Sequence, residues 1–189
     1  GGMNKRQAGE DFYFLHKFSV LDQLGEINEA LVYPSARKSD RVPFGTGKAI
    51  GQYLDQNFQL SYSLEAIHLF MNFFHQLHEF YTLDSMAAVD KLKEISPILA
   101  ESLLDQGFLQ ELDLIQKNTS GEKAFVKRFN RWANPFRLMK FLHEVRDKGF
   151  PDEEVGIAAA KLMRKIKPEE LLEDKLSLLE GYRKLDGIF

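Results

Sequence analysis

Residues 104–108 read Leu-Asp-Gln-Gly-Phe, and two further stretches, 54–58 (Leu-Asp-Gln-Asn-Phe) and 146–150 (Arg-Asp-Lys-Gly-Phe), likewise place Asn or Gly before Phe. Glycine and asparagine tolerate the left-handed backbone conformation that ends many helices, and the apolar residue that follows can pack back on the last turn. We therefore predict a helix C-terminus at each of the three stretches. The expected packing partners of the three phenylalanines are Tyr53, Leu103 and Val145.

Helix start signals alternate with these stops. Ser96-Pro97 and Asn134-Pro135 each place a capping side chain before a proline that suits the first helical position. Thr119 and Glu122 have the spacing of a capping box, and Pro168 is followed by two glutamates at the expected start of another helix. Together with the apolar periodicity, these signals predict helices at 10–32, 47–56, 63–81, 84–95, 97–106, 108–117, 120–133, 135–148, 152–166 and 168–185.

The whole pattern predicts an all-α fold, because no stretch shows the period-two alternation of a strand. We expect a multi-helix bundle or an irregular array of about eight to ten helices, without a sheet. A single helical domain over 3–189 is the simplest organisation, with a subdivision into 3–117 and 118–189 left open. Gly1-Gly2 is interpreted as an expression remnant ahead of Met3. The irregular stretch over 33–47 has the length of loops that often carry function.

Composition adds two expectations and several exclusions. The chain has 16 Phe against one Trp, so the core should be rich in phenylalanine. It has no Cys, which excludes disulfides, thiolate metal sites and a cysteine nucleophile, and favours a cytoplasmic location. No run of about 18 uncharged apolar residues occurs, so no membrane-spanning helix is expected.

Charge is concentrated in one segment, residues 119–149, which holds 8 Lys and Arg against 3 Asp and Glu although the whole chain carries a net charge of −3. At helical spacing, the cations of its first helix share one face and the aromatic residues take the other. Such a basic amphipathic helix pair can bind an acidic protein, the acidic segment 61–118 of this chain or of a second copy, or nucleic acid. A merely solvated helix face would carry the same charges. The candidate partner-binding residues are Lys123, Lys127, Arg128, Arg131, Arg137 and Lys140.

A polar arc on the predicted helix 63–81 offers a second candidate, a site for iron, manganese or zinc. Glu65-Ala66-Ile67-His68 has the Glu-x-x-His spacing of carboxylate-bridged metal bundles, but such a centre uses two of these elements and only one is present. A merely solvated helix face would produce the same arc. The residues of this alternative are Glu65, His68, His75 and Glu79.

Catalytic signatures are missing. The stretch 44–49 suggests a phosphate loop, but Val42 stands at the first glycine position and Ala49 replaces the magnesium-binding hydroxyl, so Thr46 is better explained as a helix cap. No Gly-x-Ser-x-Gly motif occurs. We therefore expect a non-enzymatic helical protein-interaction module, an adaptor or regulatory subunit, that uses the basic helix pair at 120–148. Nucleic-acid binding through the same residues is the first alternative, and metal or small-ligand binding at Glu65 and His68 is the second.

Overall fold

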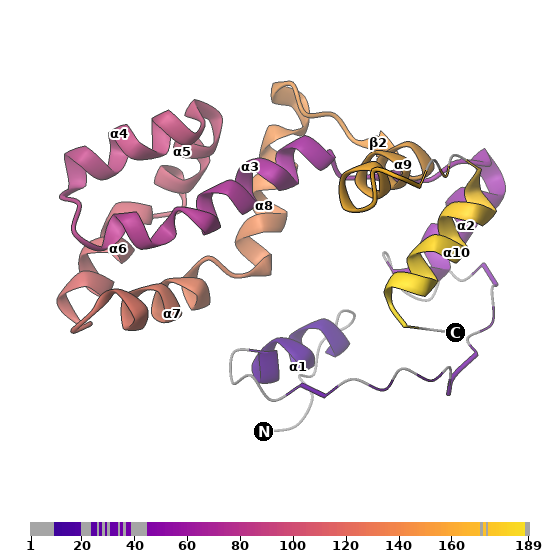
Figure 1. Ribbon diagram of the computed structural model, residues 1–189, viewed down its shortest axis with the longest axis horizontal. Helices are drawn as coiled ribbons and strands as arrows, with labels where there is room; N and C mark the ends of the chain where they lie inside the picture. The colour runs from indigo at the N-terminus through magenta and orange to yellow at the C-terminus, as the bar shows by residue number, and fades with distance from the viewer. Residues whose placement is uncertain are drawn as a thin grey trace. The chain divides into compact units, whose positions relative to one another are not determined.

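The computed structural model describes residues 10–19, 24–25, 27, 29, 31–33, 35, 37–38, 45–170, 172 and 174–187. Over these residues the fold is all-α, as predicted, with the helices and short strands drawn in Figure 1. The α-helices are α1 (Glu10–Ser19), α2 (Thr46–Gln56), α3 (Leu64–His75), α4 (Ser85–Ile95), α5 (Pro97–Asp105), α6 (Phe108–Lys117), α7 (Glu122–Trp132), α8 (Pro135–Val145), α9 (Val155–Ile166) and α10 (Lys175–Leu185). Two 3₁₀ helices, η1 (Leu77–Tyr81) and η2 (Arg146–Lys148), follow α3 and α8.

The sequence predicts no sheet, but the described residues include a very small sheet of two strands. Two strands of two residues each, β1 (Leu60–Ser61) and β2 (Glu153–Glu154), pair with one another. The backbone amide of Val155 also donates to the carbonyl of Gln59 at 2.8 Å. Strands this short carry no period-two signal, so the sequence could not reveal them.

The chain divides into two compact units. The central unit comprises Tyr62–Glu153, and the terminal unit comprises Gly1–Ser61 with Glu154–Phe189. This partition differs from the subdivision at residues 117 and 118 that the sequence left open. In the central unit α3 packs against α4 and α8, α5 packs against α4, α6 and α8, and α7 packs against α6 and η1. Helix pairs α3–α8 and α6–α7 therefore join segments on both sides of residue 117.

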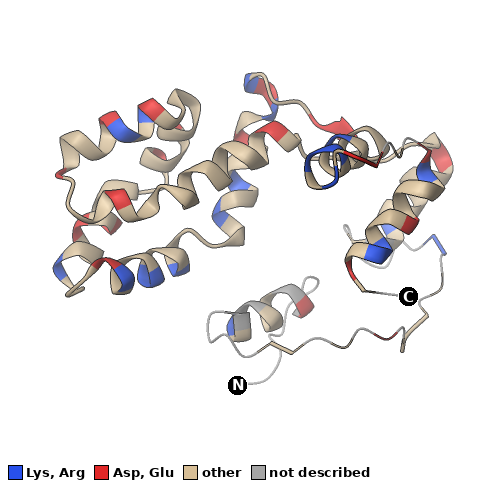
Figure 2. Ribbon diagram, in the orientation of Figure 1, with Lys and Arg blue, Asp and Glu red and all other residues tan. Residues whose placement is uncertain are grey.

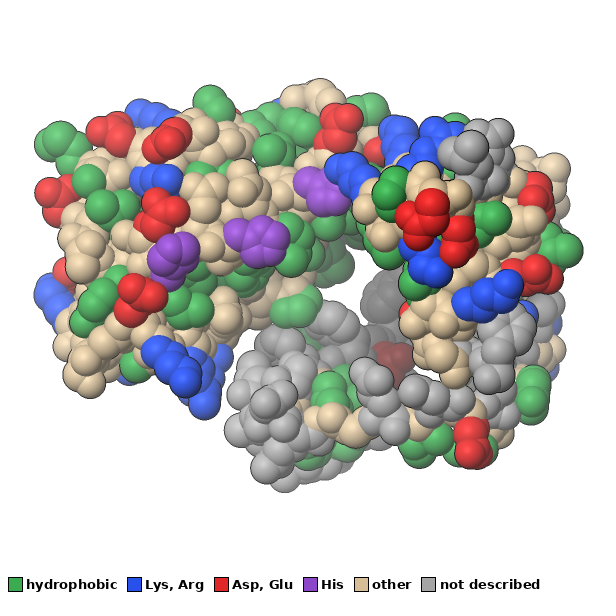
Figure 3. All heavy atoms as spheres, viewed as in Figure 1, with side chains coloured by type: hydrophobic (Ala, Val, Ile, Leu, Met, Phe, Trp, Pro, Cys, Tyr) green, Lys and Arg blue, Asp and Glu red, His purple; other side chains and the backbone are tan. Residues whose placement is uncertain are grey.

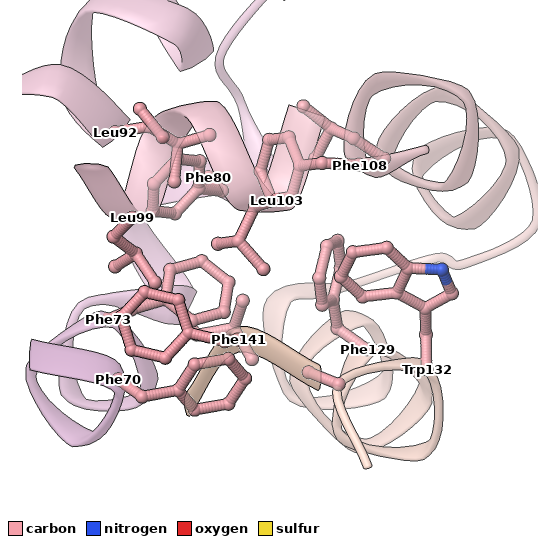
Figure 4. Close-up of a cluster of buried hydrophobic side chains, with 14 of the residues drawn as sticks. Phe70, Phe73, Phe80, Leu92, Leu99, Leu103, Phe108, Phe129, Trp132 and Phe141 are labelled. Carbon is pink, nitrogen blue, oxygen red and sulfur yellow. The ribbon is translucent and has the colours of Figure 1, made fainter. Parts of the chain in front are cut away.

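A cluster of phenylalanine rings fills the core of the central unit, as the composition predicted (Figure 4). Phe73 lies at its centre, with ring centroids 5.7 Å from Phe80, 6.0 Å from Phe108 and 6.3 Å from Phe129. These distances and the edge-on ring angles suit the quadrupole of aromatic side chains. The fully buried phenylalanines are Phe70, Phe73, Phe80, Phe108, Phe125, Phe129 and Phe141. The cluster draws on α3, η1, α6, α7 and α8, and it fixes the position of α7, which carries most of the predicted basic residues.

The three predicted stop signals are confirmed. Asn57, Gly107 and Gly149 all have positive φ angles, of 57°, 84° and 105°. Asn57 donates its backbone amide to the carbonyl of Tyr53 at 2.7 Å, which closes the last turn of α2. The cap predictions at Ser96 and Asn134 are confirmed as well, since each side chain accepts hydrogen bonds from the first turn of the helix that follows it.

Helix 63–81 is not continuous, in contrast to the prediction. It ends at His75, and the chain tightens into η1, which continues to Tyr81. The three-residue period of a 3₁₀ helix places Leu77 and Phe80 on one side, and both are fully buried. The side-chain amide of Gln116 then donates to the carbonyls of Phe80, Tyr81 and Leu83 at 2.8 to 3.1 Å. Because these carbonyls find their partner on α6, the local sequence did not reveal the change.

The end of α1 and the start of α10 differ most from the prediction. Helix α1 ends at Ser19, and the described residues between 24 and 38 are not helical. One of them is Gly25, and glycine destabilises the interior of a helix. Helix α10 begins at Lys175, because the Asp174 carboxylate accepts from the amides of Leu176 and Ser177 and forms the cap there. Pro168 lies in a turn instead.

The predicted capping box at residues 119–122 was also wrong. Gly121 occupies the cap position of α7, and no side chain caps that helix. The hydroxyl of Thr119 instead donates to the carbonyl of Ile115 at 2.8 Å, so it satisfies the end of α6. At α2 the cap position is taken by Gly45, and Thr46 is the first residue of the helix. Residues 34, 36 and 39–44 of the predicted irregular stretch lie outside the described residues.

No helix in the described ranges is long and apolar enough to cross a membrane.

Candidate basic site on the central unit

Helix α7 separates its side chains by type because its apolar residues recur at helical spacing. Phe125 and Phe129 are fully buried and Trp132 nearly so, while the cations of the same helix point outward. Figure 2 shows the Lys and Arg residues gathered along α7, and a group of them is visible at its position in the space-filling view (Figure 3). The exposed cations of this helix are Lys123, Lys127, Arg128 and Arg131.

An open hollow of about 650 Å³ lies on this basic face. Helix α7 forms one wall, Glu111 of α6 with the turn that follows α6 forms another, and the beginning of α8 closes the third side. Four of the six predicted partner-binding residues line it, Lys127, Arg128, Arg131 and Arg137. The other lining residues are Glu111, Asn118, Thr119, Ala124, Trp132 and Asn134.

Arg137 is the most firmly held of these cations. Its guanidinium carbon lies 3.9 Å from the centre of the Trp132 ring, a cation–π geometry. Its Nε donates to the Trp132 carbonyl at 2.9 Å, and one terminal nitrogen donates to the carbonyl of Gln106 at 2.8 Å. Partial burial lowers the pKa of Arg137 from its ordinary value, while the nearby carboxylate of Glu111 raises it. The group still carries its charge at neutral pH, because arginine is not deprotonated there.

The cap of α8 sets the direction of this side chain. Asn134 accepts hydrogen bonds from the amides of Phe136 at 3.0 Å and Arg137 at 3.3 Å, so the first turn of α8 starts beside the end of α7. Arg137 then reaches back over Trp132 toward α5. A sequence pattern identifies Asn134-Pro135 as a helix start, but it does not reveal this return contact.

The remaining cations of the hollow are held less tightly. One terminal nitrogen of Arg128 donates to the carbonyl of Asn118 at 3.4 Å, near the negative end of α6. The side chains of Lys127 and Arg131 are exposed, and neither forms a hydrogen bond or an ion pair with any residue that the structure describes. The hollow therefore combines two anchored guanidinium groups with two cations free to meet an anion.

Two predicted partner-binding residues lie outside the lining of the hollow. Lys123 is exposed in the first turn of α7. Lys140 lies one turn beyond Arg137 on α8, and its Nζ is 3.5 Å from the carboxylate of Glu144. The sequence missed the polar residues from the end of α6, Asn118 and Thr119, because α6 and α7 meet only in the folded chain.

The alternative metal residues are spread along α3 and η1. Glu65 and His75 are exposed, His68 is half-buried, and Glu79 belongs to η1, beyond the break in the helix. The Glu79 carboxylate lies 2.9 Å from Nζ of Lys91, and this hydrogen bond is the main reason that the pKa of Lys91 is raised. Among the described residues, no three His, Asp or Glu side chains come together as a group that could hold a metal ion.

No known protein family, no curated protein and no solved structure matches this chain.

Proposed function

We propose that this protein is a non-enzymatic interaction module that binds an acidic segment of another protein in the hollow between α6, α7 and the start of α8. One observation carries the proposal: four cations and one carboxylate line the same hollow, and none of the four cations forms an ion pair with an acidic side chain among the described residues. Cations gathered in a concave surface make the local electrostatic potential more positive and attract anions. An adaptor or regulatory role, and the cytoplasmic location expected from the sequence, belong to this proposal.

The acidic side chains of the central unit support a foreign partner over a second copy of the chain. Several of them already face cations of their own unit, which reduces what they could offer to another α7. The ion pairs are Glu79 with Lys91 at 2.9 Å, Asp113 with Lys117 at 2.7 Å and Glu101 with Lys148 at 2.9 Å. Self-association through the hollow would instead show as an increase in the mass of the protein in light scattering.

Nucleic acid is the competing interpretation, because Lys123, Lys127 and Arg131 recur every four residues and rise about 6 Å from one to the next. Single strands are held by aromatic stacking as well as by charge. Phe125 and Phe129 are fully buried and Arg137 covers the Trp132 ring, so these rings offer no stacking surface for bases. This observation favours a protein partner.

Charge reversal tests the proposal. The probe is a fluorescein-labelled peptide of alternating Glu and Gly, followed by fluorescence anisotropy at low and at physiological salt. The Lys127→Glu/Arg131→Glu variant should weaken binding by about ten- to a hundredfold, since each exposed ion pair contributes up to about 1 kcal/mol and reversal adds repulsion. Both side chains are exposed, so the fold should be unaffected.

A matched control carries the same change in net charge at another place. Lys93 on α4 and Lys184 on α10 are exposed, and the Lys93→Glu/Lys184→Glu variant should bind the peptide almost as the parent protein does. Equal losses in the two double variants, or binding that does not respond to salt, would contradict the proposal. Labelled oligonucleotides that bind in a reversal-sensitive manner while the peptide does not would replace it by the nucleic-acid alternative.

A further inference from the structure

The kind of cation in the hollow narrows the chemistry of its ligand. Three of the four lining cations are arginines, Arg128, Arg131 and Arg137, and only Lys127 is a lysine. A guanidinium group presents planar paired donors that match the oxygens of a phosphate or a carboxylate, whereas lysine acts as a point charge. The hollow is therefore suited to bind an anion through directed hydrogen bonds.

Arg137 supplies donors in a fixed orientation. Its hydrogen bonds to the carbonyls of Trp132 and Gln106 use two of its five N–H groups, and stacking on Trp132 holds the plane of the guanidinium. The other three N–H groups have no acceptor among the described residues. Binding an anion to such a pre-oriented arginine costs less side-chain entropy than binding it to a free arginine, which must first be ordered.

Charge and acceptor number distinguish a phosphate from a carboxylate. The four cations and Glu111 give the hollow a net charge of about +3, counted from its lining residues. A carboxylate carries one negative charge, whereas a phosphorylated side chain carries about −1.5 to −2 at pH 7 and three strong acceptor oxygens. One phosphate group can thus accept from several arginines at once and neutralise more of the hollow.

We propose that the acidic segment recognised by this protein carries a phosphorylated serine or threonine, and that Arg128, Arg131 and Arg137 bind its phosphate group. This inference rests on the proposed function, because it specifies the ligand of the same hollow. The segment's neighbouring acidic residues then meet Lys127 and, beyond the hollow, Lys123. Binding depends on phosphorylation, so a kinase and a phosphatase acting on the partner switch the interaction on and off.

Three labelled peptides test the inference: Gly-Glu-Glu-Ser-Glu-Glu-Gly with its serine phosphorylated, the same peptide unphosphorylated, and a version with Glu in place of the serine. Fluorescence anisotropy with the full chain should show the phosphorylated peptide binding about tenfold more tightly than the Glu version, in line with the greater strength of bidentate charge-assisted bonds. Inorganic phosphate should compete with the phosphorylated peptide.

Arg131→Lys keeps the charge of the hollow but removes one fork of donors, and Arg131 has no structural contact to lose. The variant should bind the Glu peptide as before and lose most of its preference for the phosphorylated one. The control is Arg183→Lys on α10, an exposed arginine outside the hollow, which should leave both affinities unchanged.

The outcomes separate this inference from the function on which it rests. Equal affinity for the phosphorylated and Glu peptides, each lost on charge reversal, overturns the phosphate inference and leaves the acidic-segment module in place. Failure of all three peptides to bind overturns both. Tighter, reversal-sensitive binding of a labelled RNA or DNA strand of similar length overturns the inference in favour of nucleic acid.

Discussion

Replacing Phe73 by alanine should destabilise the central unit severely, because this ring lies at the centre of the aromatic core that positions α7. Phe73 is 0% exposed. Its ring contacts those of Phe70, Phe74, Phe80, Phe108 and Phe129, with centroid distances from 5.7 to 6.3 Å. No other described aromatic side chain has as many ring neighbours, so little can move in to fill the space that the substitution leaves.

The expected cost is about 4 kcal/mol. Burying a phenylalanine removes roughly 150 to 200 Å² from water, and at about 25 cal/mol per Å² this contributes close to that figure. Measured Phe-to-Ala substitutions in cores cost about 3 to 5 kcal/mol once the cavity is included. Since whole domains are stable by only about 5 to 15 kcal/mol, the variant should be close to unfolding.

Urea denaturation measures this cost, with the fluorescence of Trp132 as the signal. Trp132 is the only tryptophan in the chain, and its ring lies 5.2 Å from that of Phe129, so it reports on the central unit alone. With an m-value of roughly 2 kcal/mol per molar urea, the midpoint should fall by about 2 M. Phe136→Ala, at a residue that is 51% exposed, should change the free energy of unfolding by less than about 0.5 kcal/mol.

If Phe73→Ala does not fold at all, Phe73→Leu retains most of the volume and should cost about 1.5 kcal/mol through the lost ring contacts. A loss below about 1 kcal/mol in the alanine variant would refute the aromatic core as described.

Three further predictions follow from local contacts. Gly107→Ala should cost about 1 kcal/mol in urea denaturation, because Gly107 has a φ of 84°. Gly121 has an extended φ of 169° and no such strain, so Gly121→Ala should cost only about 0.5 kcal/mol, because alanine is a poorer helix cap than glycine. Asn134→Ala should cost about 1 kcal/mol by removing the cap of α8, and Asn134→Ser should recover most of it. The pKa of Asp174 is lowered, mainly by its hydrogen bonds to Ser177. The ionised carboxylate therefore stabilises α10 fully above the unfolded-state pKa of about 4. This stabilisation is lost as the pH falls through the lower pKa of the folded state. Hydrogen exchange of the first-turn amides of α10 should show this loss in the parent and not in Asp174→Asn.

Most of the helical fold could be predicted because its signals are local. The left-handed residues at Asn57, Gly107 and Gly149 and the caps at Ser96 and Asn134 act on neighbouring backbone groups, so their residue types are sufficient. The features that the sequence did not reveal depend on distant partners. The 3₁₀ turn after His75 is stabilised by Gln116, and Thr119 caps the end of α6 instead of the start of α7.

The candidate site, like the fold, could be predicted only in part from the sequence. Helical periodicity placed Lys127, Arg128 and Arg131 on one outward face, and the structure brings Arg137 to the same hollow. Periodicity could not show that Arg137 lies over Trp132 or that Lys140 faces Glu144. It also could not show that residues of α6 close the hollow, since that requires the tertiary packing of α6 on α7.

The intrinsic fluorescence of Trp132 tests peptide binding in the hollow without any label, because the only tryptophan of the chain lines the hollow beneath Arg137. Titration with the unlabelled phosphorylated peptide should change the Trp132 emission with saturation, and the same titration of Lys127→Glu/Arg131→Glu should produce little change. A saturable change that persists unaltered in the reversed variant, or peptide binding with no change in Trp132 emission, would contradict the assignment of the hollow as the binding site.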